Sequence, residues 1–148
     1  MAVVEQSNAF IANVGDSRAY RFIAAESSFR QLTKDHSLVE ELVSSGQLTN
    51  EQAAFYPLRN VITRAIGTAS DIKIDMFECE WNEGDYLLLC SDGLTLHVKD
   101  SELREMLLSG EHPQKLCDKM VNLALERGGK DNVTVVIIKK TDAGGGQR

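Results

Sequence analysis

The sequence of 148 residues lacks long apolar runs and is poor in proline and aromatic residues, with two prolines and 6% Phe, Trp and Tyr. A membrane-spanning helix needs about 20 consecutive apolar residues, so none is expected. The opening residues "MAVVEQSNAF" also lack the basic flank and cleavage region of a signal peptide. The sequence therefore predicts a soluble, cytoplasmic protein with no membrane span.

Basic residues are also in the minority: 16 Lys and Arg stand against 22 Asp and Glu, giving a net charge of −6. Nucleic-acid surfaces need clustered Lys and Arg to contact phosphates, so no nucleic-acid partner is expected. The three cysteines, Cys79, Cys90 and Cys117, are an odd number without the spacing of a metal site. We expect them to be reduced thiols in or near the core.

The remaining composition, 43% hydrophobic and 26% charged, is typical of a globular protein, and the length suits one domain. No internal repeat or second domain is evident. We assign residues 1–141 to the domain and the glycine-rich residues 142–148 to a flexible tail.

Short β-rich segments separated by turns predict antiparallel strands in the first third of the chain, at 8–14, 19–23 and 29–33. A half-buried strand is expected over 71–81, where Ile72, Ile74 and Met76 alternate with other residues. The continuous apolar segment 86–91 predicts a central strand. The β-branched segment 133–138 predicts the most buried strand.

Helices are expected outside these strands. The pairs Ser37 with Glu40 and Thr49 with Gln52 fit capping boxes, which predict two helices, the first ending at Gly46. Segment 59–67 fits either a helix or an irregular loop. Further helices are expected from a cap at Asp100 through residue 108, and over 113–126, where Leu116, Met120, Leu123 and Ala124 have helical spacing.

Three aspartates stand where an apolar strand meets a glycine-bearing turn: Asp16 in "ANVGDSRAY", Asp92 in "LLLCSDGLT" and Asp131 in "GGKDNVTVV". If they converge, their oxygens favour a hard ion, Mg²⁺ or Mn²⁺, over zinc. Each also has an ordinary explanation as a turn or capping residue, and spacing alone leaves convergence open. Of the histidines, His36 suggests local hydrogen bonding, and His97 and His112 suggest solvated side chains.

Five segments, in this order, resemble bacterial members of the metal-dependent protein phosphatase family (PPM, type 2C): "ANVGDSRAY", "LTKDHSLVEEL", "RNVITRAIG", "GDYLLLCSDGLT" and "GGKDNVTVVII". The resemblance implies an α+β fold, a four-layer α/β/β/α sandwich of two antiparallel sheets. It also implies hydrolysis of phosphoserine and phosphothreonine in phosphorylated proteins, the products of Ser/Thr kinases. Two or more Mn²⁺ or Mg²⁺ ions in the complete domain would activate the attacking water.

The resemblance assigns roles to individual positions. Asp92 and Asp131 match metal ligands that act in catalysis through metal-bound water, and Asp16 matches a ligand of an additional metal. Three further candidates come with the same motifs: Gly93 as a metal ligand, and Asn132 and Arg64 as substrate-binding residues. Residues 46–67 resemble the flap beside the active site, which is expected to influence substrate choice.

Two departures from the family pattern qualify these expectations. The chain lacks the "N-E-D" and "D-G-x-G-G" segments with which similar proteins open, so it resembles the C-terminal part of the domain, with N-terminal strands missing. We therefore expect weak or no activity of the chain alone, and a possible homodimer through exposed sheet edges. Leu96 stands where bacterial relatives usually have Asp or Asn, which removes one ligand of the additional metal. A non-catalytic phosphatase-like interaction module is the alternative function.

Overall fold

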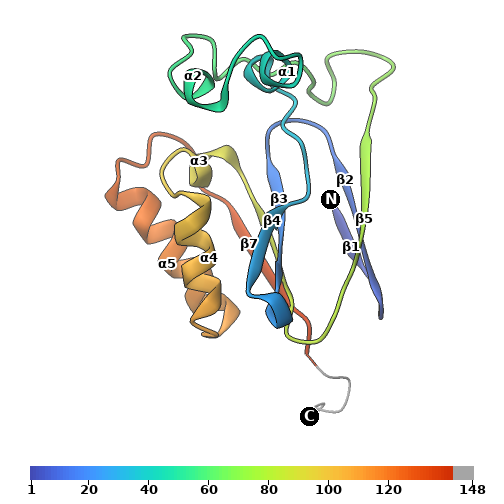
Figure 1. Cartoon of the computed structure of the whole chain (residues 1–148), viewed down its shortest axis with the longest axis vertical. Helices are drawn as coiled ribbons and strands as arrows, with labels where there is room; N and C mark the ends of the chain where they lie inside the picture. Colours follow the sequence, from blue (N-terminus) through green and yellow to red (C-terminus); the bar gives the residue numbers. More distant parts are fainter. Residues whose placement is uncertain (142–148) are drawn as a thin grey trace.

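The computed structural model describes residues 1–141, in which two antiparallel sheets face each other (Figure 1). The first sheet has the order β1 (Ala2–Val4), β2 (Asn8–Asn13), β5 (Asp75–Glu80). The second has the order β4 (Ser28–Gln31), β3 (Arg18–Ile23), β6 (Tyr86–Cys90), β7 (Val135–Lys139). The α+β class, the antiparallel sheets and the early strands are confirmed.

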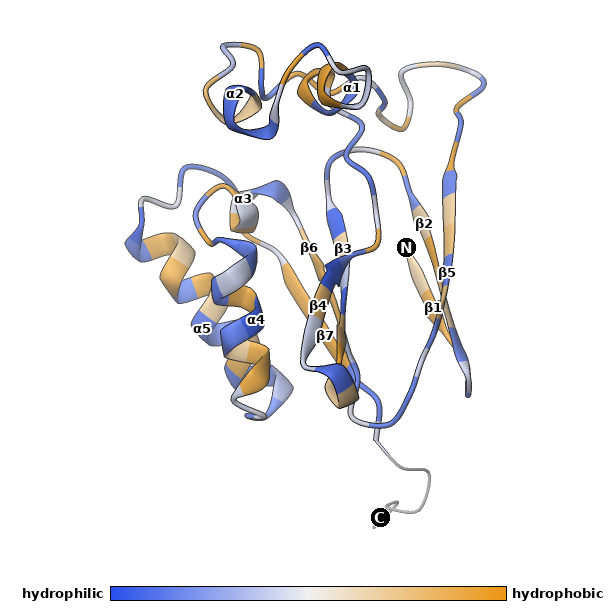
Figure 2. Ribbon diagram, in the orientation of Figure 1, coloured by the Kyte–Doolittle hydropathy of each residue, from blue (hydrophilic) through white to orange (hydrophobic). Residues whose placement is uncertain are grey.

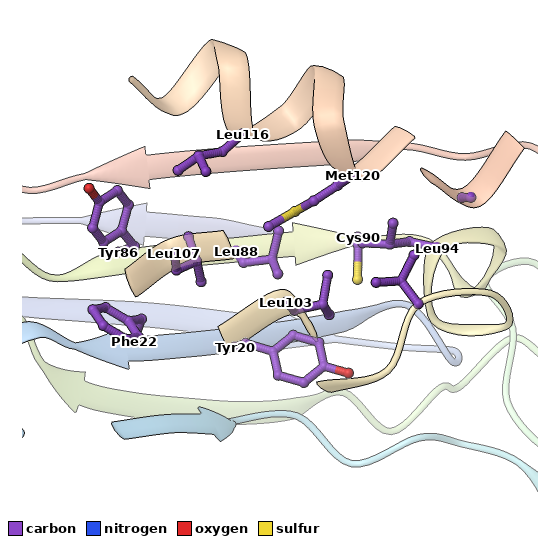
Figure 3. Close-up of a cluster of buried hydrophobic side chains, with 12 residues drawn as sticks. Tyr20, Phe22, Tyr86, Leu88, Cys90, Leu94, Leu103, Leu107, Leu116 and Met120 are labelled. Carbon is purple, nitrogen blue, oxygen red and sulfur yellow. The ribbon is translucent and has the colours of Figure 1, made fainter. Parts of the chain in front are cut away.

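The sequence of strand β6 is apolar without alternation because both faces of the strand are buried. Tyr86, Leu88 and Cys90 pack under the helices, and Leu87 belongs to the cluster between the sheets. Figure 3 shows the first set together with Leu116 and other helix residues. In Figure 2 hydrophobic colour runs along this strand, as the continuous apolar segment predicted.

Helices α4 (Asp100–Leu108) and α5 (Pro113–Glu126) cover the second sheet. Leu116, Met120 and Ala124 on α5 are fully buried, as their spacing predicted. The predicted cap at Asp100 is off by one position: Lys99 is the residue before α4, and its amide donates to Glu102 Oε2 at 3.0 Å.

The expected four layers are not all present in the part of the chain that the structure describes. Within residues 1–141 the long helices lie on the second sheet only, and the outer face of the first sheet has no helix over it (Figure 1). Met76 is 67% exposed on that face. The described residues therefore form three of the four expected layers, α/β/β.

Between β4 and β5 lie the two predicted short helices, α1 (Leu38–Ser44) and α2 (Asn50–Ala54), of which only α2 falls within the flap-like residues 46–67. Thr49 closes a complete capping box, and Ser37 Oγ accepts from the Glu40 amide at 3.4 Å. Segment 59–67, for which the sequence fitted either a helix or a loop, is an irregular loop. The remaining short helical elements are η1 (Ala24–Glu26) and α3 (Asp92–Thr95). None of the helices in residues 1–141 combines the length and the apolar character needed to cross a bilayer.

Two strand predictions were wrong in detail. Within the predicted segment 71–81 the strand β5 begins only at Asp75, so Ile74 precedes it and is 52% exposed. In β5 itself Met76 faces outward, while Phe77 and Cys79 pack toward the second sheet. Strand β7 is an edge strand of its sheet, with Val136 48% exposed, and is not the most buried strand. A β-branched segment fits a central strand and an edge strand equally well, so composition did not separate them. The predicted tail, 142–148, lies outside the described residues.

Candidate functional site

Asp92 is held at the end of the most buried strand. It is the first residue of α3, a short helix that directly follows β6 and that the sequence did not predict. Leu94 of this helix is completely buried and anchors it under α5. The Asp92 carboxylate therefore stands on rigid backbone at the rim of the second sheet.

The segment that carries Asp131 is hydrogen-bonded to the segment that carries Asp92. The hydroxyl of Ser91 donates to the carbonyl of Asn132 and accepts from the amide of Thr134, both at 3.0 Å. The Ser91 amide also donates to the Thr134 carbonyl at 3.1 Å. Residues 91–92 and 131–134 are thus fixed side by side although 40 positions separate them in sequence. Sequence reasoning missed Ser91; its place directly before an Asp-Gly turn was the available signal.

Gly93 makes this close approach possible. A Cβ atom built on Gly93 would lie 2.4 Å from the carbonyl oxygen and 3.0 Å from the carbonyl carbon of Asn132. Both atoms belong to the main chain, so no side-chain movement would relieve the contact. Two of the predicted site residues, Gly93 and Asn132, therefore meet through their backbones.

Asp16 lies in the turn between β2 and β3 and faces the same cavity as Asp92. This cavity of about 280 Å³ lies between α3 and the flap, and Arg59, Asn60 and Leu96 also line it. Burial raises the pKa of Asp16, and the negative charge of Asp92 raises it further. The two carboxylates therefore repel each other, which a cation between them would relieve.

The donor set fits a hard divalent ion in part. Carboxylate oxygens without histidine or thiolate partners favour Mg²⁺ or Mn²⁺. Within residues 1–141, however, no three His, Cys, Asp or Glu side chains come close enough together to hold an ion by themselves. The described residues thus offer a pair of carboxylates, Asp16 and Asp92, with Asp131 on the adjoining segment.

Arg64 lies apart from this cavity. Its guanidinium donates to Asp75 Oδ1 at 2.9 Å and lies 3.1 Å from His36 Nε2, and these residues line a second cavity. His36 is 3% exposed; its Nδ1 accepts from the Gly15 amide at 3.1 Å, and its Nε2 lies 3.1 Å from Asp75 Oδ2. Hydrogen bonding of His36 is therefore long-range rather than local, and it joins the flap to the ends of β2 and β5.

Leu96, the departure from the family pattern, directly follows α3 and is 49% exposed. It presents an apolar side chain to the cavity that Asp16 and Asp92 share. The side chain of a leucine offers no oxygen to an ion at this position.

Known proteins resemble this chain along nearly its whole length. The family model described as "Stage II sporulation protein E (SpoIIE)" matches residues 48–141, more than half of the chain. The "Serine/threonine phosphatase stp" of Listeria innocua is 40% identical over 94% of this chain and 54% of its own length.

Solved structures agree. The serine/threonine phosphatase Stp1 of Staphylococcus aureus superimposes with a TM-score of 0.88 at 42% identity, covering 95% of this chain and 55% of that one. The catalytic domain of the phosphatase PstP, solved in complex with two manganese ions, gives a TM-score of 0.83 at 33% identity, covering 95% of this chain and 57% of that one. The chain thus spans about half the length of the relatives that it matches. It belongs to the bacterial metal-dependent Ser/Thr protein phosphatase family, PPM type 2C.

Proposed function

We propose that these residues form part of a protein serine/threonine phosphatase that hydrolyses phosphoserine and phosphothreonine at a dinuclear Mn²⁺ or Mg²⁺ centre. The observation that carries the proposal is the attachment of the Asp131 segment to the Asp92 segment through Ser91. The relatives are about twice as long as the matched region, so the activity is proposed for the domain to which this chain contributes.

In this proposal Asp92 and Asp131 hold the ions, and Asp16 holds an additional one. Divalent ions, when bound, supply Lewis-acid polarisation of the phosphate and lower the pKa of a water. The chain itself orients the carboxylates: α3 fixes Asp92 and the Ser91 bridge fixes the backbone beside Asp131. Among the candidate substrate-binding residues, Asn132 lies on this segment, whereas Arg64 would act through the flap that it ties to Asp75.

The phosphorylated proteins of Ser/Thr kinases are the proposed substrates. The cavity between α3 and the flap is the proposed entry for the phosphorylated residue, because Asp16 and Asp92 line it. The cysteines are all free, which suits a reducing cytoplasmic compartment.

The test is Mn²⁺-dependent hydrolysis of a phosphoserine or phosphothreonine peptide, with Asp92→Asn as the matched control. Activity that disappears in the control supports the proposal. Activity that survives the substitution comes from a contaminant and counts against it.

A second candidate, a non-catalytic interaction module, is favoured by one observation: Leu96 presents an apolar side chain to the cavity in place of an oxygen ligand. Retained Mn²⁺ binding with no hydrolysis fits this candidate and also a phosphatase fragment that has weak or no activity alone. Binding of a phosphopeptide that depends on Leu96 is predicted by the interaction module only. Isothermal titration with Leu96→Asp as the variant separates it from the phosphatase.

We also propose that the chain pairs with a second copy through its sheet edges. Within the described residues no strand bonds to the outer edges of β1 and β7, where Val3 and Val136 are each 48% exposed. Unpaired edges with apolar side chains favour strand pairing between molecules. Sedimentation over a range of concentrations tests this, and a folded monomer at all concentrations contradicts it.

A further inference from the structure

His97 contacts the loop that leads to Asp131. Its Nε2 accepts a hydrogen bond from the backbone amide of Lys130 at 3.3 Å. Its Cε1 lies 3.7 Å from where a Cβ on Gly128 would be, so the imidazole ring also packs along the start of this loop. The sequence suggested a solvated side chain for His97; the ring is half-buried and has a hydrogen-bond partner 33 positions away, which spacing along the chain did not reveal.

The main chain of His97 is held from the other side. Arg127, at the end of α5, donates from Nη1 to the His97 carbonyl at 2.8 Å. The same guanidinium pairs with Glu102 of α4 through Nη1 at 2.8 Å and Nη2 at 2.6 Å. His97 therefore has a fixed backbone from which its ring reaches the loop.

The loop itself has little intrinsic rigidity. Gly128 and Gly129 both have positive φ, at 126° and 48°. Two adjacent glycines leave a chain with large conformational freedom unless neighbouring groups hold it. The Ser91 bridge fixes this loop on the C-terminal side of Asp131, and His97 contacts it on the N-terminal side.

We propose that His97 is a positioning residue: by accepting from the Lys130 amide, it sets where the Asp131 carboxylate stands relative to Asp92. The consequence for a divalent cation rests on the proposed function, whereas the ordering of the loop does not. The accepting nitrogen is Nε2, so the neutral ring carries its proton on Nδ1.

Two substitutions in the 148-residue chain separate this role from simple packing. His97→Gln keeps an acceptor that can reach the Lys130 amide, and His97→Leu keeps similar bulk without an acceptor. Amide exchange at Lys130, followed by NMR, is expected to be about tenfold faster in His97→Leu and nearly unchanged in His97→Gln. Mn²⁺ affinity by isothermal titration is expected to fall by roughly tenfold in the leucine variant alone.

Thermal unfolding of both variants verifies that they are folded. Unchanged amide exchange at Lys130 in His97→Leu overturns the proposal. An equal effect of both substitutions on this exchange also overturns it, because it would indicate that the bulk of the ring matters and its acceptor does not. If the unsubstituted chain binds no Mn²⁺, the proposed function loses support, while the exchange comparison still decides the role of His97.

Discussion

The guanidinium of Arg21 and the carboxylate of Asp85 form an ion pair inside the protein. Nη2 and Nε of Arg21 lie 2.7 and 3.1 Å from Oδ2 of Asp85, which is 1% exposed. Asp85 also accepts from the backbone amides of Ala24 and Asn82, at 3.0 and 3.1 Å. The pair thus ties β3 to the turn that precedes β6, at a distance from the candidate site.

Removing one partner of this pair is expected to be strongly destabilising. Asp85→Ala leaves the charge of Arg21 buried without a partner, and we expect the free energy of unfolding to fall by about 3–5 kcal/mol. Urea denaturation measures it. The double variant Arg21→Met with Asp85→Ala is expected to lose less than the sum of the single variants. If the free energy of unfolding of the single variant falls by less than ~1 kcal/mol, the pair contributes no more than an exposed ion pair does, which contradicts this expectation.

Glu102 gives the protein a stability component that depends on acid pH. Hydrogen bonds from Arg127, and then from the Lys99 amide, lower the pKa of Glu102 to about 2. Since the folded pKa is below the unfolded value of 4.5, this component is complete above that value and is lost as the pH falls toward 2. In Glu102→Gln the free energy of unfolding should change less over this range. Glu105→Gln removes the same charge from α4, and equal pH profiles for both variants would refute the assignment.

The cysteines are expected to be unreactive in the folded protein. Burial raises the pKa of Cys90 to about 12 and also raises the pKa of Cys79 and of Cys117. The thiolate is the reactive form, so labelling by a disulfide reagent at about pH 8 should be slow for Cys90 and limited by unfolding. Cys90→Ala should remove this slowest phase. Fast labelling of three thiols in the native protein would count against the burial.

Asp16 is expected to cost stability when no cation is present. Its pKa is raised in the folded state by burial first and by Asp92 second, so its contribution to stability is present below the ordinary value of 3.8 and is lost as the pH rises through the raised pKa. Asp16→Asn should therefore raise the unfolding temperature at neutral pH in EDTA by a few degrees. Mn²⁺ should stabilise the unsubstituted chain more than the variant. Equal stabilisation of both would show that Asp16 takes no part in binding.

Gly93 tests the contact between the two aspartate-bearing segments. In Gly93→Ala the new methyl group meets the Asn132 carbonyl, so the segment 131–134 must shift. We expect a loss of about 1–3 kcal/mol, the usual cost of overpacking. NMR should show the largest shifts at the amides of Asn132 and Thr134. An unchanged denaturation midpoint would mean that the backbones are farther apart than described.

Helix α5 could be predicted to the residue because several local signals agree. Pro113 suits the first helical position, and Leu116, Met120 and Ala124 share one face. The face of β5 could not be predicted, because apolar residues stand in both phases of its alternation. Met76 belongs to one phase and Phe77 with Cys79 to the other, and the packing of the second sheet decides between them.

The candidate site likewise has features that the sequence predicts and contacts that it does not. The junctions that carry Asp16, Asp92 and Asp131 follow from glycine turns beside apolar strands, which are local features of the sequence. The bridge through Ser91 and the contact of His97 with Lys130 join positions at least 33 residues apart. Such contacts depend on how α3 and the last loop pack together, which no local pattern records.

The double burial of β6 has a consequence for how the molecule melts. Leu88 supplies one hydrophobic cluster and Leu87 the other, and both lie on a single continuous piece of backbone. If either cluster unfolds, β6 loses its packing on that face, and the other cluster then loses the support of the same strand. Thermal unfolding followed by scanning calorimetry should therefore give a single peak. The calorimetric enthalpy from the area of this peak should equal the van't Hoff enthalpy from its width.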